Sequence, residues 1–147
     1  MKIDNSGKVN WVQLQGDCTQ EGILSLVLNQ AKEDIDHMNS LPQTNERNIK
    51  FSVEMADKGI IVRKETTKET SPYAEERSIL ASVRFSPHST NGISVYSSAT
   101  KGLVFKFTFK WDDIKTICEL RINDDTYKLW QISQMALSPL FFGRENE

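Results

Sequence analysis

The sequence lacks the long apolar runs and the strong charge bias that mark membrane and polyanion-binding proteins. No window of its 147 residues approaches the ~20 apolar residues of a membrane-spanning helix. The first eight residues lack the apolar core of a secretory signal. A formal net charge of −2 gives no reason to expect broad binding to nucleic acid or an anionic membrane. We therefore expect a cytoplasmic protein of one domain, with a frayed N-terminus over residues 1–8.

Cysteine is scarce, because the chain contains only Cys18 and Cys118. Two cysteines make neither a disulfide framework nor a zinc-binding cluster. Cys18 falls at a predicted helix start, where unpaired N–H groups would stabilise a thiolate. Free cysteine is more often simply a small buried apolar residue. We expect both residues to be reduced thiols, as is usual in the cytoplasm.

Short catalytic motifs of defined geometry are missing as well. The sequence has no G-x-S-x-G nucleophile elbow, no H-E-x-x-H zinc helix, no glycine-rich phosphate loop and no EF-hand loop. The adjacent pairs Asp112-Asp113 and Asp124-Asp125 are therefore interpreted as turns rather than as metal ligands. We expect no catalytic residue, no cofactor and no metal.

The two histidines are the remaining candidates for chemistry. Glu33, Asp34 and His37 share one face of a predicted helix, and a carboxylate beside an imidazole is what general-base chemistry or a metal site requires. No second histidine follows at helical spacing, so a solvated helix end is the favoured interpretation. His88 lies in Pro-His-Ser-Thr-Asn-Gly, whose residue types are typical of a turn.

The most informative stretch that is present runs from Leu103 to Trp111. Large apolar residues alternate there with mostly polar ones, and this period of two places the apolar set on one face of a strand. The apolar positions are Leu103, Phe105, Phe107, Phe109 and Trp111. Burial of one such side chain contributes about 1.5–3 kcal/mol. We therefore expect this strand at the centre of the core.

The start of the same strand matches part of the RNA-recognition signature K/R-G-F/Y-G/A-F-V-x-F/Y. Lys101, Gly102 and Phe105 agree with it, whereas Leu103 and Val104 do not. The signature requires aromatic residues on an open sheet face where bases can stack. The aromatic face here is too apolar to stay open, so we expect no nucleic-acid partner.

Hydrophobic periodicity predicts the other elements. Spacings of three and four indicate a helix from about Thr19 to Asn39, which Leu41-Pro42 ends. Alternation indicates a hairpin that turns at Asp57-Lys58-Gly59. The expected strands cover residues 9–14, 49–55, 60–62, 79–85, 93–96, 103–111, 118–122 and 127–130.

Residues 63–77 have a different character, and we expect them to form a charged mobile segment. Four basic and four acidic side chains balance one another, and threonine, serine and proline break any hydrophobic period. A structureless loop of this length is uncommon in a compact domain and tends to be functional or disordered. The alternative is that the flanking strands extend into it as a long solvated hairpin.

The C-terminal stretch, residues 131–142, is dense in apolar residues. It predicts a short helix that is interrupted or ended near Ser138-Pro139, because proline lacks an N–H donor and restricts the preceding residue. We hypothesise that this tail either caps the core or contributes Leu140, Phe141 and Phe142 to a partner interface, for example in a homodimer. Residues 143–147 are expected to form a polar tail.

These expectations combine into an α+β domain. A curved antiparallel meander of about six to eight strands packs on one long N-terminal helix, with a short helix at the C-terminus. Its general shape is similar to cystatin-like and helix-grip folds, by architectural analogy alone. Because no catalytic constellation is found, we favour a non-enzymatic accessory protein that acts through protein–protein contacts. The alternative is a small-molecule binder or enzyme with its site in a cavity between helix and sheet.

Overall fold

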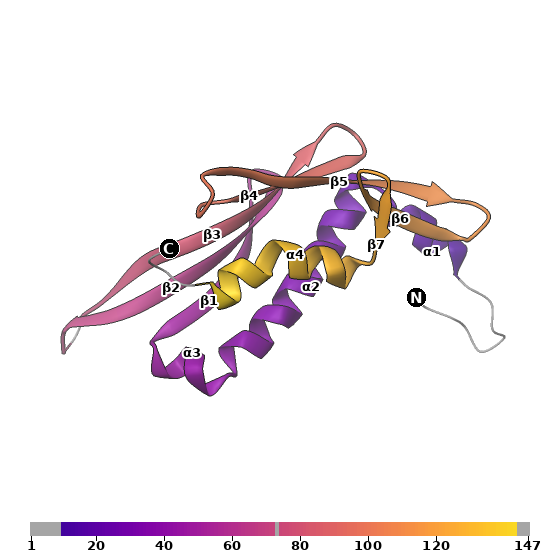
Figure 1. Ribbon diagram of the computed structural model, residues 1–147. Helices are drawn as coiled ribbons and strands as arrows, with labels where there is room; N and C mark the ends of the chain where they lie inside the picture. The colour runs from indigo at the N-terminus through magenta and orange to yellow at the C-terminus, as the bar shows by residue number, and fades with distance from the viewer. Residues whose placement is uncertain (1–9, 73, 144–147) are drawn as a thin grey trace.

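The computed structural model describes residues 10–72 and 74–143, which form one antiparallel sheet with helices on one face (Figure 1). The seven strands of the described residues lie in chain order, each paired with its neighbours in the sequence. The elements are α1 Trp11–Gly16, α2 Gln20–Asn39, α3 Pro42–Glu46, β1 Ile49–Ala56, β2 Gly59–Ser71, β3 Ala74–His88, β4 Gly92–Ser97, β5 Gly102–Asp112, β6 Ile117–Ile122, β7 Asp125–Tyr127 and α4 Leu129–Phe142. The predicted α+β meander with its long and short helices is thereby confirmed. The expected frayed residues 1–8 and most of the polar tail lie outside the described residues.

The long helix α2 begins and ends close to the predicted bounds. Thr19 caps its first turn, since its side-chain oxygen accepts a hydrogen bond from the backbone N–H of Gly22 at 3.0 Å. Gln20 joins this end of the helix to the β3–β4 turn by donating to the carbonyl oxygen of Ser89 at 2.6 Å. The spacing predicts a stripe of Leu24, Val27, Leu28, Ala31, Ile35 and Met38; all of these are buried except Leu28, which is half-buried, and Ile23 is buried in addition.

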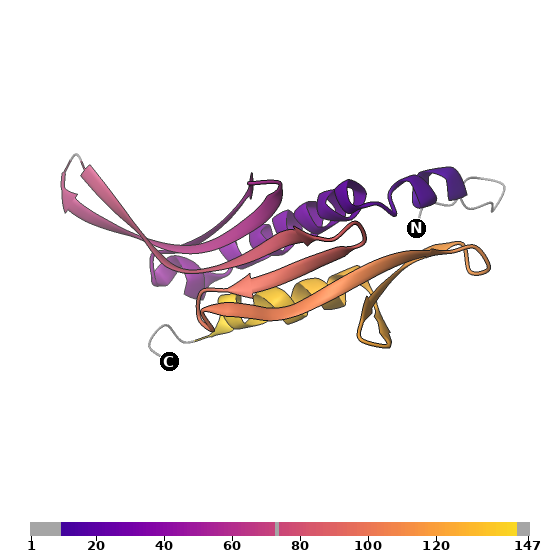
Figure 2. The same cartoon turned by 90° about the horizontal axis from the view of Figure 1, so that it is seen from above.

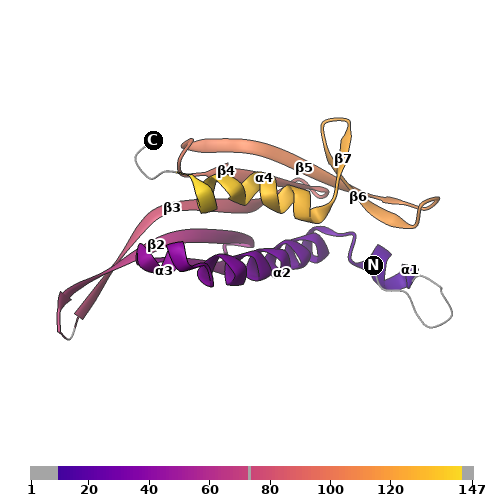
Figure 3. The same ribbon diagram turned by 60° about the horizontal axis from the view of Figure 1, so that its bottom comes forward.

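Helices α2 and α4 lie side by side on the same face of the sheet (Figure 3). Together they cover one continuous hydrophobic core, to which every strand from β1 to β6 contributes buried side chains. Its fully buried large members include Phe51, Phe85, Phe107, Ile93, Ile132 and Leu137. The core therefore depends on α4 as much as on α2.

The aromatic strand is central only in part. Phe107 and Phe109 of β5 are buried, as predicted, whereas Phe105 and Trp111 are half-buried. Leu103 remains 47% exposed because a register shift between Val95 and Tyr96 pairs it with Tyr96, which is itself 39% exposed. Alternation therefore predicts the face of a side chain only where the register of the strands stays regular.

The charged segment extends the β2–β3 hairpin, which was the alternative interpretation. Strand pairing continues to Ser71↔Ala74, and the hairpin projects beyond the helices (Figure 2). Lys64 faces inward and is only 3% exposed, and its Nζ donates to the carbonyl oxygen of Gly143 at 3.4 Å. The expectation of a structureless loop is wrong for the paired residues, and residue 73 lies outside the described part. Mobility of the hairpin stays a prediction.

The expected first strand is wrong, because Trp11–Gly16 forms the helix α1. The side chain of Asn10 caps it by accepting from the backbone N–H of Gln13 at 3.2 Å. No residue of α1 is buried, and Trp11 is 57% exposed. Apolar alternation over so few residues also fits one and a half helical turns. The segment pairs with no strand of the described sheet and contacts β6 without burying any of its side chains.

The expected break at Pro139 is also wrong, since α4 runs through it to Phe142. The helix starts at Leu129, so Leu129 and Trp130 belong to it rather than to a final strand. Because Pro139 has no N–H group, the backbone carbonyl group of Met135 lacks its donor within the helix. Both residues lie on the exposed side of α4, where water can reach this carbonyl group.

Asn39 occupies the free edge of the sheet at β1. Its amide nitrogen donates to the carbonyl oxygen of Phe51 at 3.0 Å, and its amide oxygen accepts from the N–H of Phe51 at 2.9 Å. The last residue of α2 therefore pairs with β1 much as another strand would.

None of the helices in the described ranges is both long and apolar enough to cross a bilayer.

Candidate functional site

A groove runs between α2 and α4 on the side of the helices that faces away from the sheet. This helical groove has a volume of about 440 Å³. It is lined from α2 by Asp34, His37 and Met38, and from α4 mainly by Trp130, Gln134 and Phe142. One wall therefore carries a carboxylate, and the other is aromatic and uncharged.

Asp34 fastens the two helices together at the bottom of this groove. The buried hydroxyl of Ser133 in α4 donates to Asp34 Oδ2 at 2.7 Å, and Gln30 Nε2 donates to Oδ1 at 3.0 Å. Both carboxylate oxygens are thus engaged in structure. Glu33 and His37 are exposed, and no cluster of three potential metal ligands occurs among the described residues. The structure brings Asp34 and His37 to one groove but gives them no catalytic arrangement.

The outer side of α4 is unusual because the whole helix, LWQISQMALSPLFF, contains no charged residue. Its inner side is buried through Ile132 and Leu137. Its outer side exposes Trp130 to 54%, Met135 to 39% and Phe142 to 68%. The exposed polar residue between them is the uncharged Gln134, and exposed large apolar side chains that gather on one surface often mark an interface.

The three residues expected at a partner interface have different surroundings. Leu140 is buried in the core of its own chain. The half-buried ring of Phe141 packs edge-on against Phe51, with centroids 5.0 Å apart. Phe142 alone is largely exposed, and its ring contacts Phe141 at 6.4 Å. The predicted tail thus caps the core with two residues and presents the third.

A larger groove lies at the other end of α2, between the α1–α2 connection and strands β6 and β7. We call it the disulfide groove, because Cys118 in its wall forms a disulfide that is described below. Its volume is about 790 Å³. Its apolar lining comes from Leu14, Ile23, Leu26, Ile117, Leu120 and Tyr127. Half of its polar lining is amide, from Asn10, Gln13, Asn29 and Gln131, and the rest comes from Asp17, Glu119, Thr126 and Lys128. The alternative interpretation of the sequence placed a small-molecule site between helix and sheet, but it named none of these residues, because the packing of α2, the α1–α2 connection and β6 brings them together.

Cys18 and Cys118 form a disulfide, so the expectation of two reduced thiols is wrong. Their Cα atoms are 5.5 Å apart although 100 positions separate them in the sequence. The bond ties the α1–α2 connection to β6, and Cys118 lines the groove. The connection is tight, since a Cβ atom at Gly22 would lie 2.2 Å from the carbonyl oxygen of Asp17. The disulfide therefore holds one wall of the groove in place.

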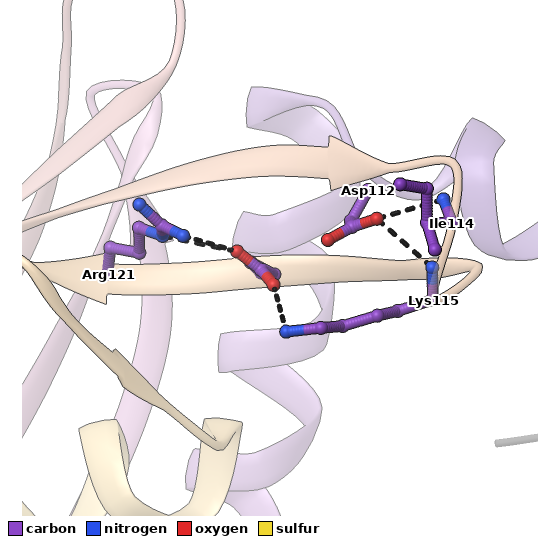
Figure 4. Close-up of polar contacts among 5 residues, drawn as sticks. Asp112, Ile114, Lys115 and Arg121 are labelled. Atoms are coloured by element: carbon purple, nitrogen blue, oxygen red, sulfur yellow. Dashed lines mark hydrogen bonds and ion pairs between the residues drawn. The ribbon is translucent and has the colours of Figure 1, made fainter.

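The β5–β6 turn beside this wall is held by carboxylates (Figure 4). Asp112 accepts from the backbone N–H groups of Ile114 at 2.9 Å and Lys115 at 3.0 Å. The hydrogen bond from Lys115, with a smaller contribution from Ile114, lowers the pKa of Asp112 below its ordinary value. Buried Glu119 accepts from Lys115 Nζ at 3.2 Å and from Arg121 at 2.9 Å. These carboxylates serve the turn and its ion pairs.

His88 ends β3 and is exposed. The following residue, Ser89, has a φ of 57°, as expected in a tight turn.

No family model, no curated protein and no solved structure matches the chain. Its function is therefore inferred from its own surfaces.

Proposed function

We propose that this chain is a non-enzymatic binding protein whose helical groove receives an amphipathic helix of a partner protein. The partner would place apolar side chains against α4 and basic side chains beside α2. The observation that carries the proposal is the uncharged outer side of α4, with Trp130 and Phe142 exposed at its two ends.

Apolar exposure at these positions supports an interface. Tryptophan and other large aromatic side chains are enriched among the residues that dominate binding energy. Trp130 and Phe142 line the helical groove from the two ends of one 14-residue helix, so a partner helix laid along the groove can contact both. Placing an amphipathic helix in an apolar groove is a recurring mode of peptide recognition.

The charge of the neighbouring helix favours a basic partner. Helix α2 carries four carboxylates and one lysine. Asp34 lines the groove, Glu33 is exposed one turn before the lining residue His37, and α4 offers no cation to balance these carboxylates. Complementary charge steers association and selects among partners, and its contribution falls as salt rises.

Two synthetic helical peptides with the same leucine stripe test the proposal, one flanked by lysine and the other by glutamate. We expect the lysine peptide to bind about tenfold more tightly at low salt, a difference of about 1.4 kcal/mol, measured by fluorescence anisotropy. The variant with Trp130→Ala and Phe142→Ala should lose at least tenfold in affinity. The matched control is Met55→Ala, since Met55 is 53% exposed on β1, outside the groove.

Equal affinity for the two peptides, or an equal loss in the Met55 variant, would contradict the proposal. Light scattering on the protein alone provides a second test. A mass of twice 16.8 kDa that returns to one chain on Phe142→Asp would assign the surface to a second copy of this chain. The partner helix would then be rejected, and the homodimer hypothesis would replace it.

A further inference from the structure

We infer that the disulfide groove is a binding site for a small neutral amphiphile, a molecule with an elongated apolar body and an uncharged end that forms hydrogen bonds. This site is separate from the helical groove and goes beyond the function proposed above. Among the residues that the structure describes, the two grooves share no lining residue.

Size and lining indicate a small molecule. The volume of about 790 Å³ lies inside the range of about 300–1,000 Å³ that is typical of ligand sites. Its apolar surface comes from helix α2 on one side, through Ile23 and Leu26, and from strand β6 on the other, through Ile117 and Leu120. An elongated apolar body can therefore be covered on two sides.

The polar lining favours a neutral end group. Of the charged lining residues, Asp17 already accepts a hydrogen bond from Gln13 at 3.0 Å, and Glu119 is paired with Lys115 and Arg121. Lys128 adds one positive charge to the lining, so the site has no charges of one sign alone. Amide side chains both donate and accept, which suits hydroxyl, amide or ester groups.

The disulfide makes this site sensitive to reduction. Helix α1 buries none of its residues, so little apolar burial holds its wall against β6. The covalent bond between Cys18 and Cys118 fixes the connection next to it. When a dithiol reductant transfers two electrons and two protons to the bond, the protein gains two thiols and the reductant becomes a cyclic disulfide. The wall is then free to leave the sheet, and we expect affinity to fall.

Titration calorimetry with monododecanoylglycerol, below its micelle concentration, tests the inference. We expect saturable binding of one molecule per chain, and about tenfold weaker binding of dodecanoate and of dodecyltrimethylammonium. Leu26→Gln should weaken binding at least tenfold, because Leu26 is a groove residue that is 37% exposed and tolerates a polar side chain. The matched control Leu103→Gln, at 47% exposure on β5 and outside the groove, should bind as the wild type does.

Three results would overturn the inference: no saturable binding to the oxidised wild type, unchanged affinity in Leu26→Gln, or tighter binding of either ion than of the neutral compound. Oxidised and dithiol-treated protein are compared in the same assay, and equal affinity would refute the role of the disulfide. Trp130→Ala is expected to retain amphiphile binding. Failure here therefore differs from failure of the helix-binding proposal, which Trp130 carries.

Discussion

Loss of the Cys18–Cys118 disulfide should strongly destabilise the protein. Cross-linking two residues lowers the entropy of the unfolded chain, and the effect grows with the length of the closed loop. For the separation of 100 positions, the chain-entropy model gives about 4.7 kcal/mol at 25 °C. Since about 1 kcal/mol shifts the midpoint of a domain of this size by about 2–4 °C, melting should fall by roughly 10–20 °C.

Two kinds of perturbation separate the cross-link from side-chain packing. Reduction of the wild type removes only the bond, whereas Cys18→Ala and Cys118→Ala also remove sulfur atoms that pack against the core. Either single substitution breaks the same bond. The double variant should therefore be only slightly less stable than each single variant, and the effects should not add.

Urea unfolding, followed by circular dichroism with and without a dithiol reductant, provides the measurement. The variants should be insensitive to the reductant, which makes them the control for reductant effects elsewhere. A wild type that loses less than about 1 kcal/mol on reduction would refute the entropic reasoning. Additive losses in the two single variants would instead show that side-chain packing dominates.

Other expectations concern the core, the β5–β6 turn and α4. Phe107→Ala should cost about 3–5 kcal/mol in urea unfolding and Lys106→Ala no more than about 0.5, because Phe107 is 1% exposed and Lys106 is solvated; equal losses would mean that the strand faces are wrongly assigned. The lowered pKa of Asp112 implies stabilisation that is present above its ordinary value of 3.8 and lost as pH falls through the lowered value, so Asp112→Asn should remove this pH dependence of stability. Pro139→Ala should raise the free energy of unfolding by about 1–3 kcal/mol, because an N–H donor is restored inside α4; no gain would show that the proline costs nothing there.

The sequence predicts those elements whose burial follows a single period. The stripe of α2 and the β1–β2 hairpin were predictable, since their apolar residues pack on one uniform layer. α1 was not, because a six-residue segment with no buried side chain has no period to test. α4 continues through Pro139 because water can reach the unpaired carbonyl group of Met135. Which side of the helix is exposed depends on tertiary packing, and no local sequence pattern shows it.

The candidate sites were less predictable than the fold. The disulfide joins residues 100 positions apart, and its formation depends on the place of β6 in the sheet. The disulfide groove depends on the same placement. In the C-terminal tail, composition indicated an apolar surface, but only packing separates buried Leu140 from exposed Phe142.

The pairing of Asn39 with Phe51 has a consequence for solubility. An open sheet leaves the outer backbone groups of its first strand unpaired, and such an edge is a template for strands of other molecules. The amide of Asn39 already occupies the N–H and the carbonyl group of Phe51, close to the start of the eight-residue edge of β1. Because one side chain takes the place of a neighbouring strand at Phe51, this part of the β1 edge is closed to pairing with the sheet of another molecule.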